Sequence, residues 1–468
     1  MADKIDPQWA WQAYKPSADN PWDLKKAGHL CRRAGFGASW PELQAALKDG
    51  PEKAIDRLLQ GEEESPEMKE AAGLLNKAAR QNIAQARGWW LARMLEGPHP
   101  LREKITLFWH NHFATSVKKV INPGYMFGQY ELMYRLALGN FRTMLQEMSK
   151  DPAMMVWLDT VQSKKGQPNE NYARELMELF SLGIGNYTEK DIREAAKAFT
   201  GWEIQNAKFH FNEAQFDSGT KSVLGKNGNL KGEDIVDICL SQPSCPRFVA
   251  RKMFRFLISE MITPPPELIE PLAEQFRASD FDIRKLVETM LRSNLFFAPE
   301  AYRARIKAPV DFVLGIVRGL GIRVSLTAMG TALESLGQDL FAPPSVKGWD
   351  GGQSWLQGQT LLFRQNLALA LSSRDGAYVR RPAGAEISDP FDLLHKYGKN
   401  SPEAKVDFLL NLFLQGDVVA ETRVRLIDYV EKSQQQKLPV YWTKEDRERH
   451  PSRALCHLVL TLPEFQLD

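Results

Sequence analysis

Apolar residues recur at the spacing of an α-helix along most of this chain, and this periodicity limits the fold more than any other feature. Glycines, prolines and capping residues separate the periodic segments, and few stretches show the alternation of a β-strand. The sequence therefore predicts a mainly α protein, with residues 1–468 forming one large multi-helix body. Helices are predicted at residues 23–34, 40–48, 51–60, 67–96, 101–112, 124–137, 170–182, 189–200, 246–259, 282–292, 309–320, 360–371, 402–413 and 419–433.

The best-marked helix boundaries lie near residue 200. Thr188 and Asp191 have the spacing of a capping box, and Gly201 has the position of a C-cap, so the helix at 189–200 is well defined. The following stretch WEIQNAKFHF alternates apolar and polar residues around a possible turn at QNAK. We expect a minor β hairpin here, as a small insertion within residues 202–230.

Composition limits the class of protein and its location. A chain of 468 residues with 43% hydrophobic residues can bury a large core, and 60 basic against 58 acidic residues leave a net charge of only +2. We therefore expect no nucleic-acid partner. The N-terminus has no signal-peptide pattern, and no apolar stretch approaches the roughly 20 residues of a membrane span, so a cytoplasmic location without a membrane span is predicted. The four cysteines fit neither a zinc-ribbon spacing nor a disulfide framework.

Several long segments resemble the hallmark segments of a bacterial family catalogued as domain of unknown function 1800. They are LREKITLFWHNHFATS, SKDPAMMVWLD, NENYARELMELFSLGIGNYTEKDIREAAKAFTGW, FVARKMFRFLIS and GQDLFAPPSVKGWDGGQSWL, and the resemblance runs from PWDLKKAGHLCRRAGFG to LPEFQLD. It implies one mostly helical body over nearly the whole chain and brings no established reaction.

The resemblance also carries expectations about partners. Members of the family are often exported, and their genes often neighbour those of a sulfatase-like family catalogued as domain of unknown function 1501, which makes such a protein a candidate partner. This chain departs from the family pattern in two ways. Its N-terminal residues show no signal-peptide pattern, so we expect no export signal, and in QFDSGTK it has Phe216 where the histidine of a His-Asp pair is expected.

The segment FWHNHFATS, residues 108–116, places two histidines around an asparagine. On a regular helix that begins at Leu101, His110 and His112 point about 200° apart and cannot bind one metal ion. If the helix ends near Trp109, the two rings can converge, as His-x-His pairs do on strands. The alternative is structural, with His112 hydrogen-bonded in the core and His110 on the surface.

The segment NENYARELMELF, residues 169–180, has a polar stripe that contains Asn171, Arg174, Glu175 and Glu178. Two carboxylates at positions i and i+3, with a guanidinium between them, suit general acid/base chemistry or a hard metal ion. The alternative is a solvated helix face with an ion pair between Arg174 and Glu178, which contributes little to stability.

The segment APPSVKGWDGGQSWL, residues 342–356, has the composition of a binding loop. Trp349 and Trp355 offer flat apolar faces beside the charges of Lys347 and Asp350, which suits a sugar ring or another planar ligand. Alternatively, the tryptophans fasten the loop to the helical body.

Other candidates rest on weaker patterns. Lys221 in DSGTKSVLG has neighbouring glycine and hydroxyl groups for binding an anion in a turn, or else it lies in solvent. Asp159 and Asp217 are second-tier catalytic candidates. The sequence contains no phosphate-binding loop, dinucleotide fingerprint, nucleophile elbow or HExxH zinc motif.

Two hypotheses of function follow. The first is an enzyme with hydrolytic or related acid/base chemistry, with a saccharide or sulfated glycan as the candidate substrate and a divalent metal ion as the candidate cofactor. In this hypothesis the HNH segment and the NENYARE helix lie near one another. The catalytic candidates are His110, His112, Glu175, Glu178, Asp159 and Asp217, and the ligand-binding candidates are Arg174, Asn171, Lys221, Lys347, Trp349 and Trp355. The second hypothesis is a non-catalytic binding or assembly protein, in which the same polar residues form a buried structural network and the sulfatase-like protein is the partner.

Overall fold

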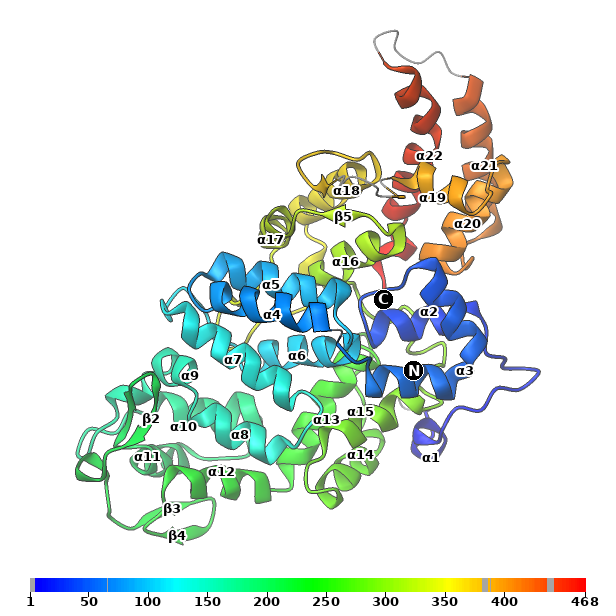
Figure 1. Cartoon of the computed structure of the whole chain (residues 1–468). Helices are drawn as coiled ribbons and strands as arrows, with labels where there is room; N and C mark the ends of the chain where they lie inside the picture. The colour runs from blue at the N-terminus through cyan, green and yellow to red at the C-terminus, as the bar shows by residue number, and fades with distance from the viewer. Residues whose placement is uncertain (1–4, 65, 381–385, 388, 436–441) are drawn as a thin grey trace.

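The computed structural model describes residues 5–64, 66–380, 386–387, 389–435 and 442–468. In these residues it contains twenty-two α-helices and three two-stranded antiparallel sheets, so the predicted mainly α class is confirmed (Figure 1). None of the described helices combines the length and apolar character that a membrane-crossing helix requires. All four cysteines are free thiols.

Eleven helices belong to the first 200 residues. They are α1 (Pro7–Trp11), α2 (Leu24–Arg33), α3 (Trp40–Gln60), α4 (Pro66–Ala79), α5 (Ile83–Glu96), α6 (Pro100–His112), α7 (Pro123–Leu136), α8 (Phe141–Ser149), α9 (Pro152–Trp157), α10 (Asn171–Glu175) and α11 (Glu189–Ala198). A π-helical turn, Leu176–Ser181, directly follows α10.

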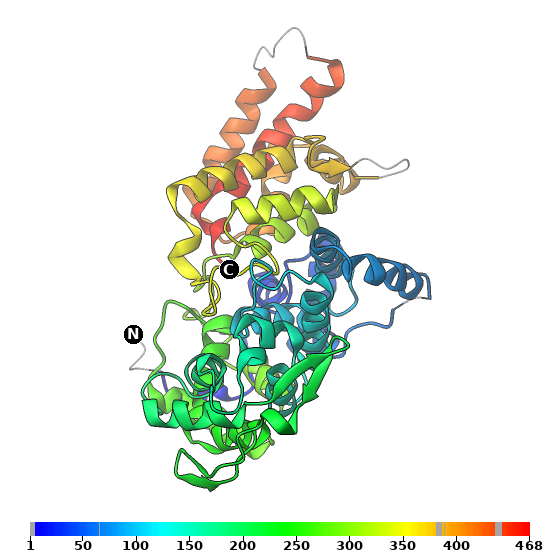
Figure 2. The same ribbon diagram turned by 90° about the vertical axis from the view of Figure 1, so that its left-hand side faces the viewer.

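The remaining helices follow the hairpin region. They are α12 (Gly232–Ser241), α13 (Ser244–Leu257), α14 (Pro266–Ala278), α15 (Ile283–Arg292), α16 (Pro309–Leu320), α17 (Leu326–Ser335), α18 (Gly358–Ser372), α19 (Pro390–Lys396), α20 (Pro402–Leu414), α21 (Ala420–Gln435) and α22 (Lys444–Thr461). In Figures 1 and 2 the last of these helices, drawn in orange and red, project from one end of the molecule.

The predicted helix over 67–96 is wrong, because this segment forms two helices, α4 and α5. The side chain of Asn82 accepts hydrogen bonds from the N–H groups of Ala84 and Gln85 and so starts α5 as a new helix. The break predicted between 48 and 51 is confirmed, since α3 has a kink at Gly50 with φ of 79°.

The expected hairpin within 202–230 is present, and it is followed there by a second one. Strand β1 (Trp202–Gln205) pairs with β2 (Lys208–Phe211), and β3 (Lys221–Val223) pairs with β4 (Lys226–Gly228). Asn206 and Ala207 form the first turn with positive φ at both positions, as a tight turn between twisted strands requires. The third sheet, β5 (Arg323–Val324) with β6 (Val379–Arg380), was not predicted.

Buried hydrophobic residues form two large clusters and one small cluster. One large cluster lies mainly among α1–α3, α8 and α10–α15, and the other lies mainly among α5, α7 and α16–α22. The small cluster joins Ile306 and Ala308 to Trp349 and Trp355. Helix α6 contributes to both large clusters and therefore lies between them. The single domain stays a prediction.

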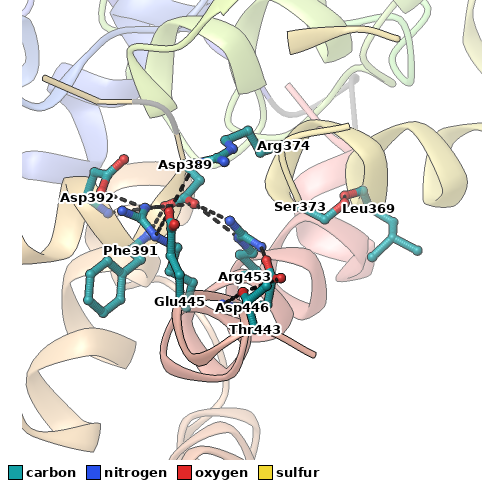
Figure 3. A network of polar contacts seen from close by, with 11 residues as sticks. Leu369, Ser373, Arg374, Asp389, Phe391, Asp392, Thr443, Glu445, Asp446 and Arg453 are labelled. Carbon is teal, nitrogen blue, oxygen red and sulfur yellow. Dashed lines mark hydrogen bonds and ion pairs between the residues drawn. The ribbon is translucent and has the colours of Figure 1, made fainter. Parts of the chain in front are cut away.

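A buried carboxylate fastens α19 to α22 (Figure 3). Asp389, which is fully buried, accepts hydrogen bonds from Nε of Arg453 at 3.0 Å and from Nη1 of Arg449 at 3.0 Å. Its Oδ1 also caps α19 by accepting from the N–H groups of Phe391 and Asp392. Two guanidinium partners and two main-chain donors compensate for the desolvation of this carboxylate.

Candidate functional site

Helix α6 continues through His112, so the alternative in which it ends near Trp109 is wrong. The two histidines therefore point to different neighbours. Nε2 of His110 accepts a hydrogen bond from the main-chain N–H of Phe341 at 3.1 Å, and the ring contacts Trp90. The surface position considered for His110 is also wrong, because the residue is fully buried. Burial lowers the pKa of His110 to about 3, so the ring is neutral.

His112 is the hydrogen-bonded core histidine that the structural alternative describes. Its Nε2 lies 3.1 Å from the carbonyl oxygen of Phe180, and the rings of Phe113 and Phe180 are 5.3 Å apart. The HNH segment thus packs on the NENYARE segment, as expected. Across the part of the chain that the structure describes, no three His, Cys, Asp or Glu side chains are grouped to hold a metal ion.

The π-helical turn after α10 joins three segments through its main chain. Phe180 faces His112 of α6, and Nζ of Lys252 in α13 donates to the carbonyl oxygen of Leu179 at 3.4 Å. Wide turns of this kind occur mostly as single turns, frequently at functional sites. The sequence predicts a helix here without indicating that its last turn is wide.

Arg174 does not pair with Glu178, so the predicted ion pair is wrong. Its guanidinium binds both carboxylate oxygens of Glu189, at 2.7 and 2.8 Å, and approaches Glu170 at 3.4 Å. The carboxylate of Glu178 instead accepts a hydrogen bond from the hydroxyl of Tyr187 at 2.7 Å. Arg174 is therefore held at the first turn of α11.

Glu175 and Glu178 lie close enough for their charges to interact, as their spacing predicts. Burial raises the pKa of Glu175 and the charge of Glu178 raises it further, while Arg174 and Lys347 lower it. Lys347 belongs to the tryptophan loop, residues 342–356. Glu175 thus lies within electrostatic range of a charge on this loop.

Asp159 and Asn171 lie beside each other at the surface. Nζ of Lys119 binds the Asp159 carboxylate at 2.7 Å, and the side-chain amide of Asn171 approaches the same carboxylate at 3.5 Å. Asp159 has a left-handed φ of 57° after α9. Neither residue lines a cavity with the other candidates that the structure brings together.

Lys221 is buried, so the expectation that it lies in solvent is wrong. Its Nζ donates to the carbonyl oxygens of Asp217 and Gly219, at 2.5 and 3.0 Å, and lies 4.6 Å from the centre of the Phe216 ring. The carboxylate of Asp217 accepts the N–H of Gly219 at 2.9 Å. Phe216, where a histidine is expected, therefore forms one wall of a cage around an ammonium group.

The tryptophan loop is fastened by Asn111, the residue between the two histidines. Its Oδ1 accepts the N–H of Trp349 at 2.7 Å, and its Nδ2 donates to the carbonyl of the same residue at 3.3 Å. Gly348 has a φ of +82°, and a Cβ atom there would collide with Asn111. Trp349 and Trp355 are both buried and pack against Ile306 and Ala308, so both tryptophans contact the helical body, and their role toward a ligand stays a prediction.

A cavity of about 260 Å³ lies beneath this loop. Its walls come from α6, α13, the segment before α16 and the loop, and three of the predicted ligand-binding residues line it: Lys347, Trp349 and Trp355. Asp350, which the sequence places beside the tryptophans, lines it too. The other polar lining residues were not predicted, and they are Asn111, Lys252, Arg255, Glu260, Arg305, Asp311 and Gln338.

The charged groups of the cavity are of both signs, with four cations and three carboxylates. Burial lowers the pKa of Lys252 to about 8, and the neighbouring Arg255 lowers it as well. Nη2 of Arg255 donates to the carbonyl of Asp350 at 3.1 Å, and Nη1 of Arg305 donates to that of Phe256 at 2.6 Å. The cations are thus oriented largely by main-chain carbonyls.

A signal for Lys252 and Arg255 was present in FVARKMFRFLIS, where basic and apolar residues alternate at helical spacing. That pattern predicts one solvent-exposed face on an otherwise buried helix, and Arg251 and Arg255 are indeed exposed. It does not show that this face adjoins the tryptophan loop, which lies about a hundred residues further along the chain.

Comparison with known proteins identifies the family. A family model described as a protein of unknown function (DUF1800) matches residues 29–467. No curated protein and no solved structure matches the chain. Since the match covers nearly all of the sequence, the chain belongs to the DUF1800 family.

Proposed function

We propose that this protein is an acid/base enzyme that hydrolyses an anionic saccharide in the cavity beneath the tryptophan loop. The observation that supports the proposal best is the composition of this cavity, in which Trp349 and Trp355 adjoin Lys252, Arg255 and Arg305. Aromatic faces suit the apolar side of a sugar ring, and guanidinium groups suit a sulfate or carboxylate substituent.

Lys252, which lines the cavity, and Glu175, which lies outside the lining but within electrostatic range of the lining residue Lys347, supply the acid/base pair of the proposal. A lysine with a pKa of about 8 is partly neutral near pH 7 and accepts a proton from water, while a carboxyl with a raised pKa donates one to the leaving oxygen. The proton lost by water goes to Lys252, and the hydroxide oxygen bonds to the sugar carbon. The bond between that carbon and the leaving oxygen breaks, and the leaving oxygen takes the proton of Glu175. Proton exchange with solvent then restores both groups.

This assignment moves the catalytic role away from the two histidines. His110 and His112 each have one ring nitrogen within hydrogen-bond distance of the main chain and are neutral, which suits a structural role. A metal-assisted reaction at these histidines is therefore not part of the proposal.

The second candidate is a non-catalytic binding or assembly protein whose partner is the sulfatase-like protein. The observation that favours it is that signature polar residues bind main-chain groups of other segments, as Asn111, His110 and His112 do. Such a network rigidifies a fold without turnover. A cytoplasmic location is retained as part of either proposal.

The test is a calorimetric titration with sulfated or uronate-containing oligosaccharides and with neutral oligosaccharides of the same length. We expect saturable binding of the anionic series only, weakened at least tenfold in Arg255→Gln. Arg251→Gln is the matched control, because Arg251 lies on the same helix outside the cavity lining. Equal binding of both series, or no binding, contradicts the proposal.

A further inference from the structure

A second and larger cavity, of about 500 Å³, lies between α2, α3 and the segment that connects α5 to α6. It shares no lining residue with the cavity beneath the tryptophan loop. Its volume falls within the range of small-molecule sites.

Small side chains in its walls keep this cavity open. Ala38, Ala45, Ala46 and Ala54 all line it, where larger aliphatic residues at helix–helix contacts would fill the space. Leucines and prolines form much of the remaining lining, so the interior of the cavity is mainly apolar. An apolar ligand would gain free energy by leaving water for this space.

The exposed edge of the cavity carries an excess of negative charge. Glu62, Glu63 and Glu96 line it as exposed residues, and none has an ion pair among the described residues. The two cationic residues of the lining are already neutralised, because Arg57 pairs with Asp49 and Arg318 pairs with Glu42. Helix α5 ends at Glu96, and its C-terminal carbonyl end adds negative potential.

We propose that this cavity binds a small amphiphilic cation, with its apolar body between α2 and α3 and its ammonium group at the three carboxylates. The apolar interior of the cavity favours an apolar body on the ligand, and the unpaired carboxylates favour a positively charged head group. This site is independent of the proposed hydrolysis.

The experiment compares three probes with eight-carbon chains and different head groups: octyltrimethylammonium, octanol and octanoate, each below its micelle concentration or solubility limit. Calorimetric titration of the full chain should show saturable binding of the ammonium compound, at least tenfold tighter than that of octanoate, with octanol between them. Equal binding of the ammonium compound and octanoate overturns the proposal, as does an absence of binding.

Two sets of variants locate the site. Ala45→Leu places a larger side chain in the cavity and should abolish binding, whereas Gln44→Leu adds the same side chain at an exposed neighbour outside the lining and should not. A triple Glu→Gln change at Glu62, Glu63 and Glu96 should remove the preference for the ammonium head group. Unchanged binding by Ala45→Leu or an unchanged preference in the triple variant contradicts the assignment.

Cys31 provides a readout on the unmodified protein. It is half-buried and lines the cavity, whereas the other three cysteines are buried. Octyltrimethylammonium at saturation should slow maleimide labelling of Cys31 severalfold, as measured by peptide mass spectrometry. Labelling of Cys31 at the same rate with and without the probe would place any binding elsewhere and overturn the proposal.

Discussion

Nε2 of His112 lies 3.1 Å from the carbonyl oxygen of Phe180, and this contact joins α6 to the π-helical turn that follows α10. Lys252 approaches the adjacent carbonyl, of Leu179, from α13. Each of the two contacts joins residues that are about 70 positions apart in the sequence. They join the NENYARE segment to α6 and α13, two helices that line the cavity beneath the tryptophan loop.

Replacing Glu175 by Gln separates the two candidate functions. No hydrogen bond or ion pair holds the Glu175 carboxylate among the described residues, and burial disfavours its charge, so the amide should leave the melting temperature within about a degree of wild type. The enzyme proposal predicts that turnover falls at least a hundredfold. A drop of several degrees, measured by calorimetry, would favour the structural network.

The pH dependence of stability should reveal the neutral His110. Above pH 6.5 the ring is neutral in both folded and unfolded chains, so it contributes no pH dependence. Below pH 6.5 the unfolded chain binds a proton that the folded chain, with a pKa of about 3, does not bind, so stability falls as the pH falls. The loss is about 1.4 kcal/mol per pH unit.

His110→Gln isolates this effect from the other titrating groups, because glutamine retains an acceptor for the N–H of Phe341 and does not titrate. The difference in unfolding free energy between wild type and variant, measured in urea, should shrink by about 1.4 kcal/mol per unit between pH 6 and pH 4. A difference that stays constant over this range would show that His110 is protonated in the fold.

Gly348→Ala should loosen the tryptophan loop. The new Cβ atom would collide with Asn111 at a residue whose φ is +82°, so both the loop and its two hydrogen bonds to Asn111 must shift. We expect a loss of about 1–3 kcal/mol in unfolding free energy and weaker ligand binding. Gly358→Ala is the control, because its Cβ would meet no atom within 4 Å; a comparable loss there would remove the argument.

Lys221→Met should destabilise the hairpin β3–β4 without affecting the cavity. The change removes the hydrogen bonds to the carbonyls of Asp217 and Gly219 and leaves these groups without their partner, at a cost of about 1–3 kcal/mol. Lys226→Met in the same hairpin alters an exposed lysine and should be neutral. If Lys221→Met abolishes ligand binding while stability is retained, Lys221 is a binding residue after all.

Local patterns in the sequence predicted most of the helices, the capping box at Thr188 and the first hairpin, because these depend on residues close in the chain. The contact between the HNH and NENYARE segments was also expected. The burial of Lys221 was not expected. A charged residue in a polar loop is predicted to lie in solvent, and the sequence does not show that the carbonyl groups of its own turn enclose it.

The cavity could not be predicted for a different reason. Lys252 lies on a helix whose sequence pattern predicts only which face is exposed to solvent and which is buried. Its hydrogen-bond partner, the carbonyl of Leu179, is 73 residues away. Asn111 fastens Trp349 across 238 residues. Such positions depend on tertiary packing of several segments, for which a single sequence has no periodic signal.

We propose above that an anionic saccharide occupies the cavity beside Lys252. The most direct test of this proposal is acetylation of surface amines near pH 7.5, followed by peptide mass spectrometry, with and without a sulfated oligosaccharide. Exposed Lys285 serves as the internal reference. We expect rapid acetylation of Lys252 in the free protein, strongly slowed by the sulfated ligand and unaffected by its neutral counterpart. Acetylation of Lys252 at the same rate in all three samples would contradict it.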